Sequence, residues 1–262
     1  MAKKGKRVRL AAITPTLDWS HRQRTSNERF DLTAAREYIE SHLRLCFRLM
    51  AEAAVMGADL VLGPEYFRGS ELFTTTPENQ RLIVETAEGP TVQRMRELSK
   101  KRGVCLAAAM AMLHDGGIAE TGVLTGRKGE LAGIQVKNTS VPEDSPLRCG
   151  YKLFDLDIGK VGIFTCSDLT NYPEDTIPLA KAGMQIVLVP GCGFAGHHWK
   201  SYLTVRALDL SCVVVHADGG RASIVNSRGE VLAETNTNEA IIYANVVIEP
   251  KEPVTRLRCL LG

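Results

Sequence analysis

No stretch of this sequence is long and apolar enough to cross a bilayer. The most apolar segments, such as Val104–Leu113 and Ile186–Pro190, have the length of strands rather than the about 20 residues of a membrane helix. The basic start of the chain is followed only by the short apolar stretch Leu10–Ile13, which is less than a signal peptide requires. The sequence therefore predicts a cytoplasmic protein with no membrane partner.

An excess of charge of one sign is also missing. The chain has 32 basic and 30 acidic residues, a formal net charge of +2, and these charges are interspersed. The exception is a short basic cluster at the N-terminus, which we interpret as a solvated chain end: Lys3, Lys4, Lys6, Arg7 and Arg9. Nucleic-acid binding is not expected, because no basic patch or stripe stands out.

The cysteines form no recognisable disulfide or zinc pattern. There are seven of them, an odd number, and no CxxC pair occurs. The neighbouring His197 and His198 cannot share one face of a helix as paired metal ligands do. No metal is therefore predicted. Most of the cysteines are expected to be small buried hydrophobes, and one of them is a candidate nucleophile.

Linkers and low-complexity segments are absent too, so the 262 residues are expected to form a single domain, 1–262. Apolar periodicity predicts strand–helix–strand units in both halves of the chain, separated by hairpins. The predicted helices start near Asp31 or Thr33, at Pro90, near Pro173 and at His197. Two mixed sheets flanked by helices, a four-layer αββα sandwich, would accommodate these units.

Three reactive side chains follow predicted strands directly. Glu65 comes after Ala58–Leu62, Lys137 after Leu131–Val136, and Cys166 at the end of Lys160–Thr165. The carboxyl ends of strands are where α/β sheets bind ligands. A carboxylate next to a thiol can act as general base, and an ammonium can stabilise the anion formed when the thiolate attacks a carbonyl or nitrile. Backbone N–H groups at Ser167 or Asp168 would complete an oxyanion hole.

The contexts of these three residues resemble the nitrilase superfamily of carbon–nitrogen hydrolases. DLVLGPE over 59–65 is similar to the family's D-L-[VI]-x-x-P-E, and GELAGIQVK over 129–137 to its G-E-x-x-G-x-x-x-K. GKVGIFTCSDLTNYPE over 159–174 is similar to G-K-[IV]-G-x-x-x-C-x-D-x-x-x-P-E. The resemblance extends over roughly residues 7–248, and these motifs occur in the family's order.

This resemblance implies the αββα fold, a Glu65–Lys137–Cys166 triad and a thioester or thioimidate intermediate. It implies no metal or organic cofactor, and a homodimer or higher homo-oligomer. Many members carry a second glutamate shortly after the lysine, and Glu143 resembles that residue. However, Pro142 stands five positions after Lys137, where the family has a proline after four.

The expected function is hydrolysis of a non-peptide C–N bond in a small linear amide, an N-carbamoyl compound or a nitrile. We expect an amidase-like enzyme rather than a true nitrilase. Tyr66 and Cys192 are expected to line the substrate site. Two alternatives stay open from the sequence: a catalytically silent member of the same fold, and an acyltransferase that uses an amine in place of water.

Overall fold

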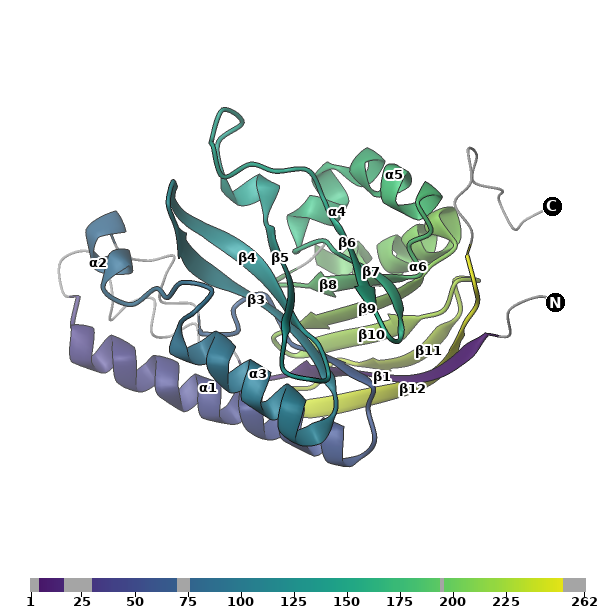
Figure 1. Ribbon diagram of the computed structural model, residues 1–262, viewed down its shortest axis with the longest axis horizontal. Helices are drawn as coiled ribbons and strands as arrows, with labels where there is room; N and C mark the ends of the chain where they lie inside the picture. Colours follow the sequence, from purple (N-terminus) through teal and green to yellow (C-terminus); the bar gives the residue numbers. More distant parts are fainter. Residues whose placement is uncertain (1–4, 17–29, 70–75, 194–195, 252–262) are drawn as a thin grey trace.

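Two six-stranded sheets lie face to face between two layers of helices (Figure 1). The computed structural model describes residues 5–16, 30–69, 76–193 and 196–251. The first sheet has the order β12-β1-β2-β3-β4-β5, with bounds in that order Ala240–Ile248, Lys6–Thr14, Leu60–Leu62, Cys105–His114, Gly117–Thr125 and Leu131–Val136. The second has the order β11-β10-β9-β8-β7-β6, with bounds Val231–Thr235, Arg221–Val225, Val213–Asp218, Ile186–Pro190, Gly159–Ile163 and Leu153–Leu156.

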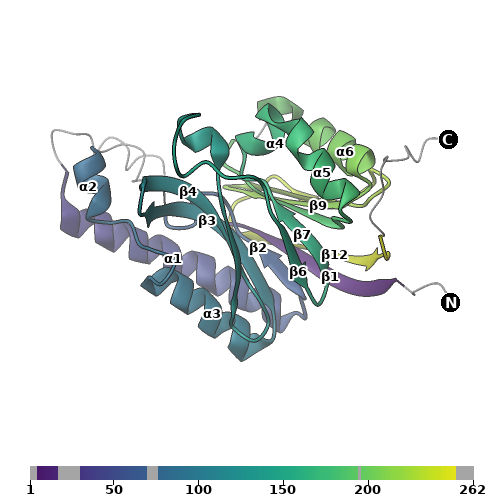
Figure 2. The ribbon, with the colours of Figure 1, turned by 45° about the horizontal axis from the view of Figure 1, so that its top comes forward.

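The helices divide between the two outer faces. Figure 2 shows α1 (Leu32–Val55) and α3 (Pro90–Arg102) on one side, and α4 (Ser167–Asn171), α5 (Thr176–Lys181) and α6 (Trp199–Leu210) on the other. Shorter segments are α2 and three 3-10 turns: α2 (Pro77–Arg81), η3 (Asn138–Ser140), η4 (Pro173–Asp175) and η5 (Gly196–His198). The predicted αββα sandwich is confirmed.

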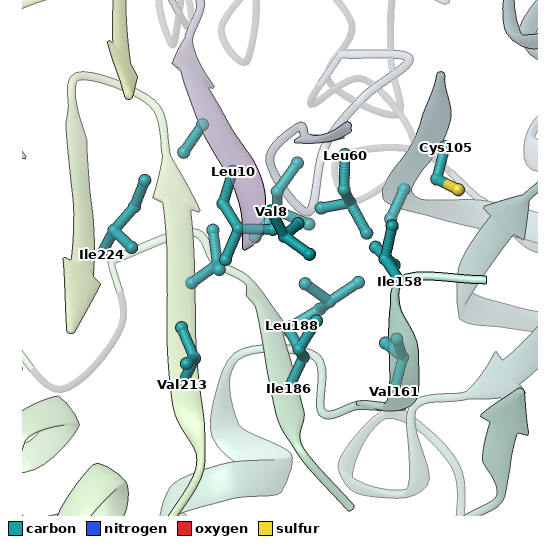
Figure 3. Close-up of a cluster of buried hydrophobic side chains, with 14 of the residues drawn as sticks. Val8, Leu10, Leu60, Cys105, Ile158, Val161, Ile186, Leu188, Val213 and Ile224 are labelled. Atoms are coloured by element: carbon teal, nitrogen blue, oxygen red, sulfur yellow. The ribbon is translucent and has the colours of Figure 1, made fainter. Parts of the chain in front are cut away.

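Three layers of apolar side chains hold the sandwich together. The middle layer lies between the sheets and joins residues such as Leu10 and Leu60 of the first sheet to Val161 and Leu188 of the second (Figure 3). A second layer packs α1 and α3 on the first sheet, and a third packs α5 and α6 on the second. Since both sheets are covered on both faces, their central strands are apolar throughout rather than alternating.

Local signals in the sequence explain where the long helices begin and end. The Asp31 side chain caps α1 by accepting hydrogen bonds from the backbone N–H groups of Thr33 and Ala34. Pro90 occupies the first turn of α3, and Gly103 ends that helix in the left-handed conformation, with a φ of 63°. Both helices were expected at these places.

Several boundaries differ from the prediction. β1 begins at Lys6, so the basic residues from Lys6 onward belong to a sheet and not to a solvated terminus, while Lys3 and Lys4 lie outside the described residues. The helix expected from Pro173 begins only at Thr176. Its later start places Pro178 in the first turn, where a missing N–H breaks no helical hydrogen bond. The short helices α2 and α4 were not predicted.

Within the described part of the chain, no helix combines the length and the apolar character needed to span a membrane. No group of three His, Cys, Asp or Glu side chains suited to a metal ion occurs among the same residues.

Candidate active site

Glu65 lies in a loop that is held by backbone hydrogen bonds to both sheets. The loop leaves β2 and runs beside β3, with Gly63 N–H donating to Ala107 O at 2.7 Å and Phe67 N–H donating to Ala109 O at 3.0 Å. Glu65 N–H itself donates to Gly191 O at 3.2 Å, after β8 of the other sheet. The Glu65 side chain is 1% exposed. Its carboxylate is therefore fixed at the seam between the two sheets.

Lys137 is placed directly beside this carboxylate. Its backbone N–H donates to Glu120 O of β4 at 2.7 Å, which extends the β4–β5 pairing by one residue. Its Nζ donates to Glu65 Oε1, and the lysine side chain is 13% exposed. The carboxylate and the ammonium thus form a nearly buried ion pair.

Cys166 sits on a strained turn between β7 and α4. Its φ of 48° and ψ of −112° lie in a region that residues with a Cβ atom rarely adopt, at a cost of about 1–3 kcal/mol. The turn is held by the Cys166 N–H, which donates to Pro190 O at 2.8 Å, and by Leu169 N–H, which donates to Cys166 O at 3.2 Å. The thiol interacts with the Glu65 carboxyl by a hydrogen bond and lies 3.7 Å from Cys192 O.

The charges of this cluster are strongly coupled. Burial raises the pKa of the Cys166 thiol to about 12, and the neighbouring Glu65 charge adds to the rise while Lys137 opposes it. Burial also raises the pKa of Glu65, against the attraction of Lys137. Burial lowers the pKa of Lys137, but Glu65 and Cys166 outweigh it, so that the net shift is upward. A thiol with a raised pKa is mostly protonated near neutral pH, so a base would have to remove this proton for Cys166 to act as a nucleophile.

A second set of hydrogen bonds joins the lysine loop to the cysteine turn. Asp168 Oδ1 accepts from Thr139 N–H at 2.9 Å and from Thr139 Oγ1 at 3.0 Å, and Ser167 Oγ lies 2.7 Å from Thr139 Oγ1. Asp168 is fully buried. Its carboxylate therefore accepts hydrogen bonds that hold the two loops together.

Two further residues expected at the site, Tyr66 and Cys192, lie next to one another, and Cys192 O is 3.7 Å from the Cys166 sulfur. The half-buried Tyr66 forms a side-chain hydrogen bond with Cys192, and burial raises the pKa values of both groups. The loop after Cys192 is anchored by Asp218, whose carboxylate accepts from Gly193 N–H at 2.8 Å and from Arg221. The structure thus brings Glu65, Lys137 and Cys166 together with both of these residues.

A family model described as carbon-nitrogen hydrolase matches residues 25–251. This match covers most of the 262 residues. The chain belongs to the carbon-nitrogen hydrolase family. The resemblance to the nitrilase superfamily of carbon–nitrogen hydrolases is thereby confirmed.

Several curated relatives of this carbon-nitrogen hydrolase bear amidase names, and others bear nitrilase names. It is 26% identical to the deaminated glutathione amidase of Escherichia coli O157:H7 over 231 residues, which is 80% of this chain and 86% of the relative. It is 28% identical to the omega-amidase NIT2 of Danio rerio over 231 residues, 77% of this chain and 80% of the relative. Among solved structures, Saccharomyces cerevisiae Nit3, of the nitrilase superfamily, has a TM-score of 0.72 at 20% identity, with 95% of this chain and 93% of that chain covered.

Glu143 and Glu120 occupy very different places in this hydrolase. Glu143 is exposed, and its described interactions include attraction to Arg148 rather than contact with Lys137. Glu120 of β4 is 2% exposed, and its charge acts on both Glu65 and Lys137. Sequence reasoning did not single out Glu120. The available signal was a carboxylate in a predicted strand that has no other charged residue, Ile118–Thr125.

Proposed function

We propose that this chain is an amidase in which Cys166 is the nucleophile, Glu65 the general base and acid, and Lys137 the group that stabilises developing negative charge. One observation carries this proposal: the buried Glu65 carboxyl contacts both the Lys137 ammonium and the Cys166 thiol. A carboxylate between a thiol and an ammonium can accept the proton of the first while remaining paired with the second.

The first half-reaction forms a thioester. Glu65 takes the Cys166 proton as Sγ bonds to the amide carbon, and the carbonyl π electrons move to oxygen. Lys137 and the Ser167 N–H, which has no carbonyl of its own helix to bind at the first position of α4, are placed to stabilise the oxyanion. The C–N bond then breaks as Glu65 returns the proton to nitrogen, and ammonia or an amine leaves.

The second half-reaction regenerates the thiol. Glu65 takes a proton from water as the water oxygen bonds to the thioester carbon. Collapse of this second tetrahedral intermediate breaks the S–C bond, and the Glu65 proton returns to Cys166. The carboxylic acid leaves, and atoms and charges balance without a cofactor.

An amide substrate is favoured over a nitrile or an N-carbamoyl compound by the named activities of the relatives, a deaminated glutathione amidase and an omega-amidase. The test is ammonia release from matched linear amides, N-carbamoyl amines and nitriles, combined with intact-protein mass spectrometry after rapid acid quench. We expect the largest kcat/KM with an amide and an acyl adduct that is lost in Cys166→Ala. Hydrolysis at equal rates by the parent and Cys166→Ala would contradict the nucleophile.

The same experiment separates the alternatives. Addition of hydroxylamine yields hydroxamate in proportion to how well an amine competes with water for the thioester. If a natural amine in place of hydroxylamine gives mainly the substituted amide rather than the carboxylic acid, the chain is an acyltransferase. If Cys166 resists iodoacetamide across the pH range and no amide is hydrolysed, the chain is a catalytically silent member.

We also propose that the chain is cytoplasmic, folds as one domain and works as a homodimer. Apolar side chains that stay exposed near the neighbouring strands β11 and β12 support self-association, namely Val231, Leu232 and Val247. Light scattering coupled to size-exclusion chromatography tests the dimer, and a monomeric mass at micromolar concentration would contradict it.

A further inference from the structure

Glu120 is a buried carboxyl in the middle of the sandwich. It lies in β4 opposite Ala111 of β3, and its side chain is 2% exposed. Within the described residues, neither of its carboxylate oxygens has a hydrogen-bond partner. An ionised carboxylate in such a place would lose its hydration without replacement, which is strongly unfavourable. The neutral acid is the form that this environment favours.

The charged and titratable groups that face Glu120 come from several elements. Glu65 and Tyr66 come from the loop after β2, and Lys137 follows β5. On β4 itself the neighbouring Thr121 hydrogen-bonds His114 of β3 at 2.8 Å, on the opposite face of the strand.

The cysteine turn lies close to the same stretch of β4. A Cβ atom on Gly122 would lie 2.6 Å from Ile163 Cγ2 and 3.5 Å from Thr165 Oγ1. β4 therefore contacts the end of β7 within two residues of Glu120 and just before Cys166. The carboxyl thus lies in the charged centre of the site and not in a separate part of the core.

We propose that Glu120 is a positioning residue that shares a single proton with Glu65 across Lys137, so that these three side chains carry no net charge before Cys166 reacts. This inference rests on the proposed function. With the proton on Glu120, Glu65 is the ionised partner of Lys137 and the available base. Burial and the Glu65 charge, opposed by Lys137, raise the pKa of Glu120 well above its usual range, in agreement with this assignment.

The arrangement also balances charge during attack. Before attack, the Glu65 carboxylate and the Lys137 ammonium neutralise one another while Glu120 is neutral. When the Cys166 proton moves to Glu65, the negative charge moves to sulfur and then to the substrate oxygen, and Lys137 pairs with it instead. If Glu120 lost its proton at high pH, a second negative charge would oppose the thiolate and activity would fall.

The test compares the full-length parent with Glu120→Gln, which imitates the neutral acid, and with Glu97→Gln, an exposed glutamate of α3, as control. The rate of Cys166 alkylation by iodoacetamide is followed against pH by peptide mass spectrometry. We expect the midpoint for Glu120→Gln to lie at least about one pH unit below that of the parent. The alkylation profile of Glu97→Gln should match that of the parent.

Activity and infrared spectra give two further measurements. We expect the fall of kcat/KM at high pH to occur at a higher pH in Glu120→Gln than in the parent, because no second negative charge can form beside the thiolate. The parent at neutral pH should show the carbonyl stretch of a buried protonated carboxyl group that Glu120→Gln lacks. Overlapping alkylation profiles for parent and Glu120→Gln would overturn the proposal, as would a parent without that infrared band, whether or not the variant folds.

Alkylation and infrared spectra need no turnover, so the two proposals can fail separately. A shifted alkylation profile in a chain that hydrolyses no amide would leave the shared proton standing and remove the proposed function. Amide hydrolysis with an unshifted alkylation profile would support the proposed function and overturn the shared proton.

Discussion

The two sheets of this carbon-nitrogen hydrolase have the same pattern of strand directions but supply different chemistry. Starting from β12 in one sheet and from β6 in the other, each has an antiparallel pair, two parallel pairs and two antiparallel pairs. The first sheet and its loops supply the ionisable oxygen and nitrogen groups, Glu65, Glu120 and Lys137. The second supplies the sulfur groups, Cys166 and Cys192.

This division shows that neither half is a site by itself. In the first half alone, two carboxyls and an ammonium form a buried electrostatic cluster with no nucleophile. The second half alone contributes the thiol but not the Glu65 carboxyl that contacts it. The reactive arrangement exists because the sheets pack face to face, so the predictions below remove one contribution at a time.

The largest effect is expected from removing the sulfur contribution. Cys166→Ala should lower kcat/KM for an amide by at least about 10⁴-fold, because the sulfur proposed to form the thioester is removed. Its unfolding temperature should stay near that of the parent. Cys212→Ala is the matched control: it removes a buried thiol under α6 and should lose about 1–2 kcal/mol of stability while keeping kcat. Activity retained in Cys166→Ala would assign the nucleophile elsewhere.

Removal of the ammonium from the first sheet should come next. Lys137→Met keeps the length of the side chain and should lower kcat by about 10²–10³-fold, because the oxyanion loses its positive partner and Glu65 is left as an unpaired buried carboxyl. Lys128→Met, at an exposed position in the β4–β5 turn, controls for the loss of one charge. Equal kcat values for the two variants would show that Lys137 is structural.

A smaller effect is expected from loosening the link between the halves. Asp168→Ala removes the acceptor for Thr139 and should lower kcat/KM by about 10–100-fold, because Lys137 and Cys166 are no longer held in register. Asp168→Asn keeps an oxygen acceptor and should recover most of the activity. If Asn fails as completely as Ala, the charge of Asp168 matters rather than the hydrogen bond.

The smallest effect concerns stability against pH. An acid whose pKa is higher in the folded than in the unfolded protein stabilises the fold at pH values below the unfolded pKa. This stabilisation is lost as the pH rises from the unfolded to the folded pKa. The unfolding constant then changes by at most a factor of about 10 per pH unit. Glu120 is such a group. The unfolding free energy of Glu120→Gln should therefore decline less than that of the parent between about pH 5 and pH 8 in urea titrations. If the unfolding free energies of the parent and Glu120→Gln decline in parallel, the carboxyl at position 120 is ionised in the folded protein.

Much of the fold could be predicted, because local patterns and packing agree. Leu131–Val136 was predicted with the bounds that β5 has, and Gly103 ends α3 as expected. The five-residue helices α2 and α4 were not predicted, because so short a segment shows no apolar periodicity. The chain pattern also could not say whether Pro178 kinks a helix or begins one.

The site was partly predictable for a related reason. Glu65, Lys137 and Cys166 each follow an apolar strand, and the structure brings all three together. The second glutamate was not predictable, because a strand with apolar residues on both faces gives no indication of which side chains meet across the sheets. Glu143 had the right position along the chain, whereas Glu120 is the glutamate that lies beside Lys137 in space.

The left-handed turn at Cys166 implies a conflict between stability and activity. Glycine adopts such a φ without strain, so Cys166→Gly would relax the backbone at the position of the proposed nucleophile. Selection for thermal stability alone would therefore favour glycine at this position, whereas the proposed reaction requires a cysteine.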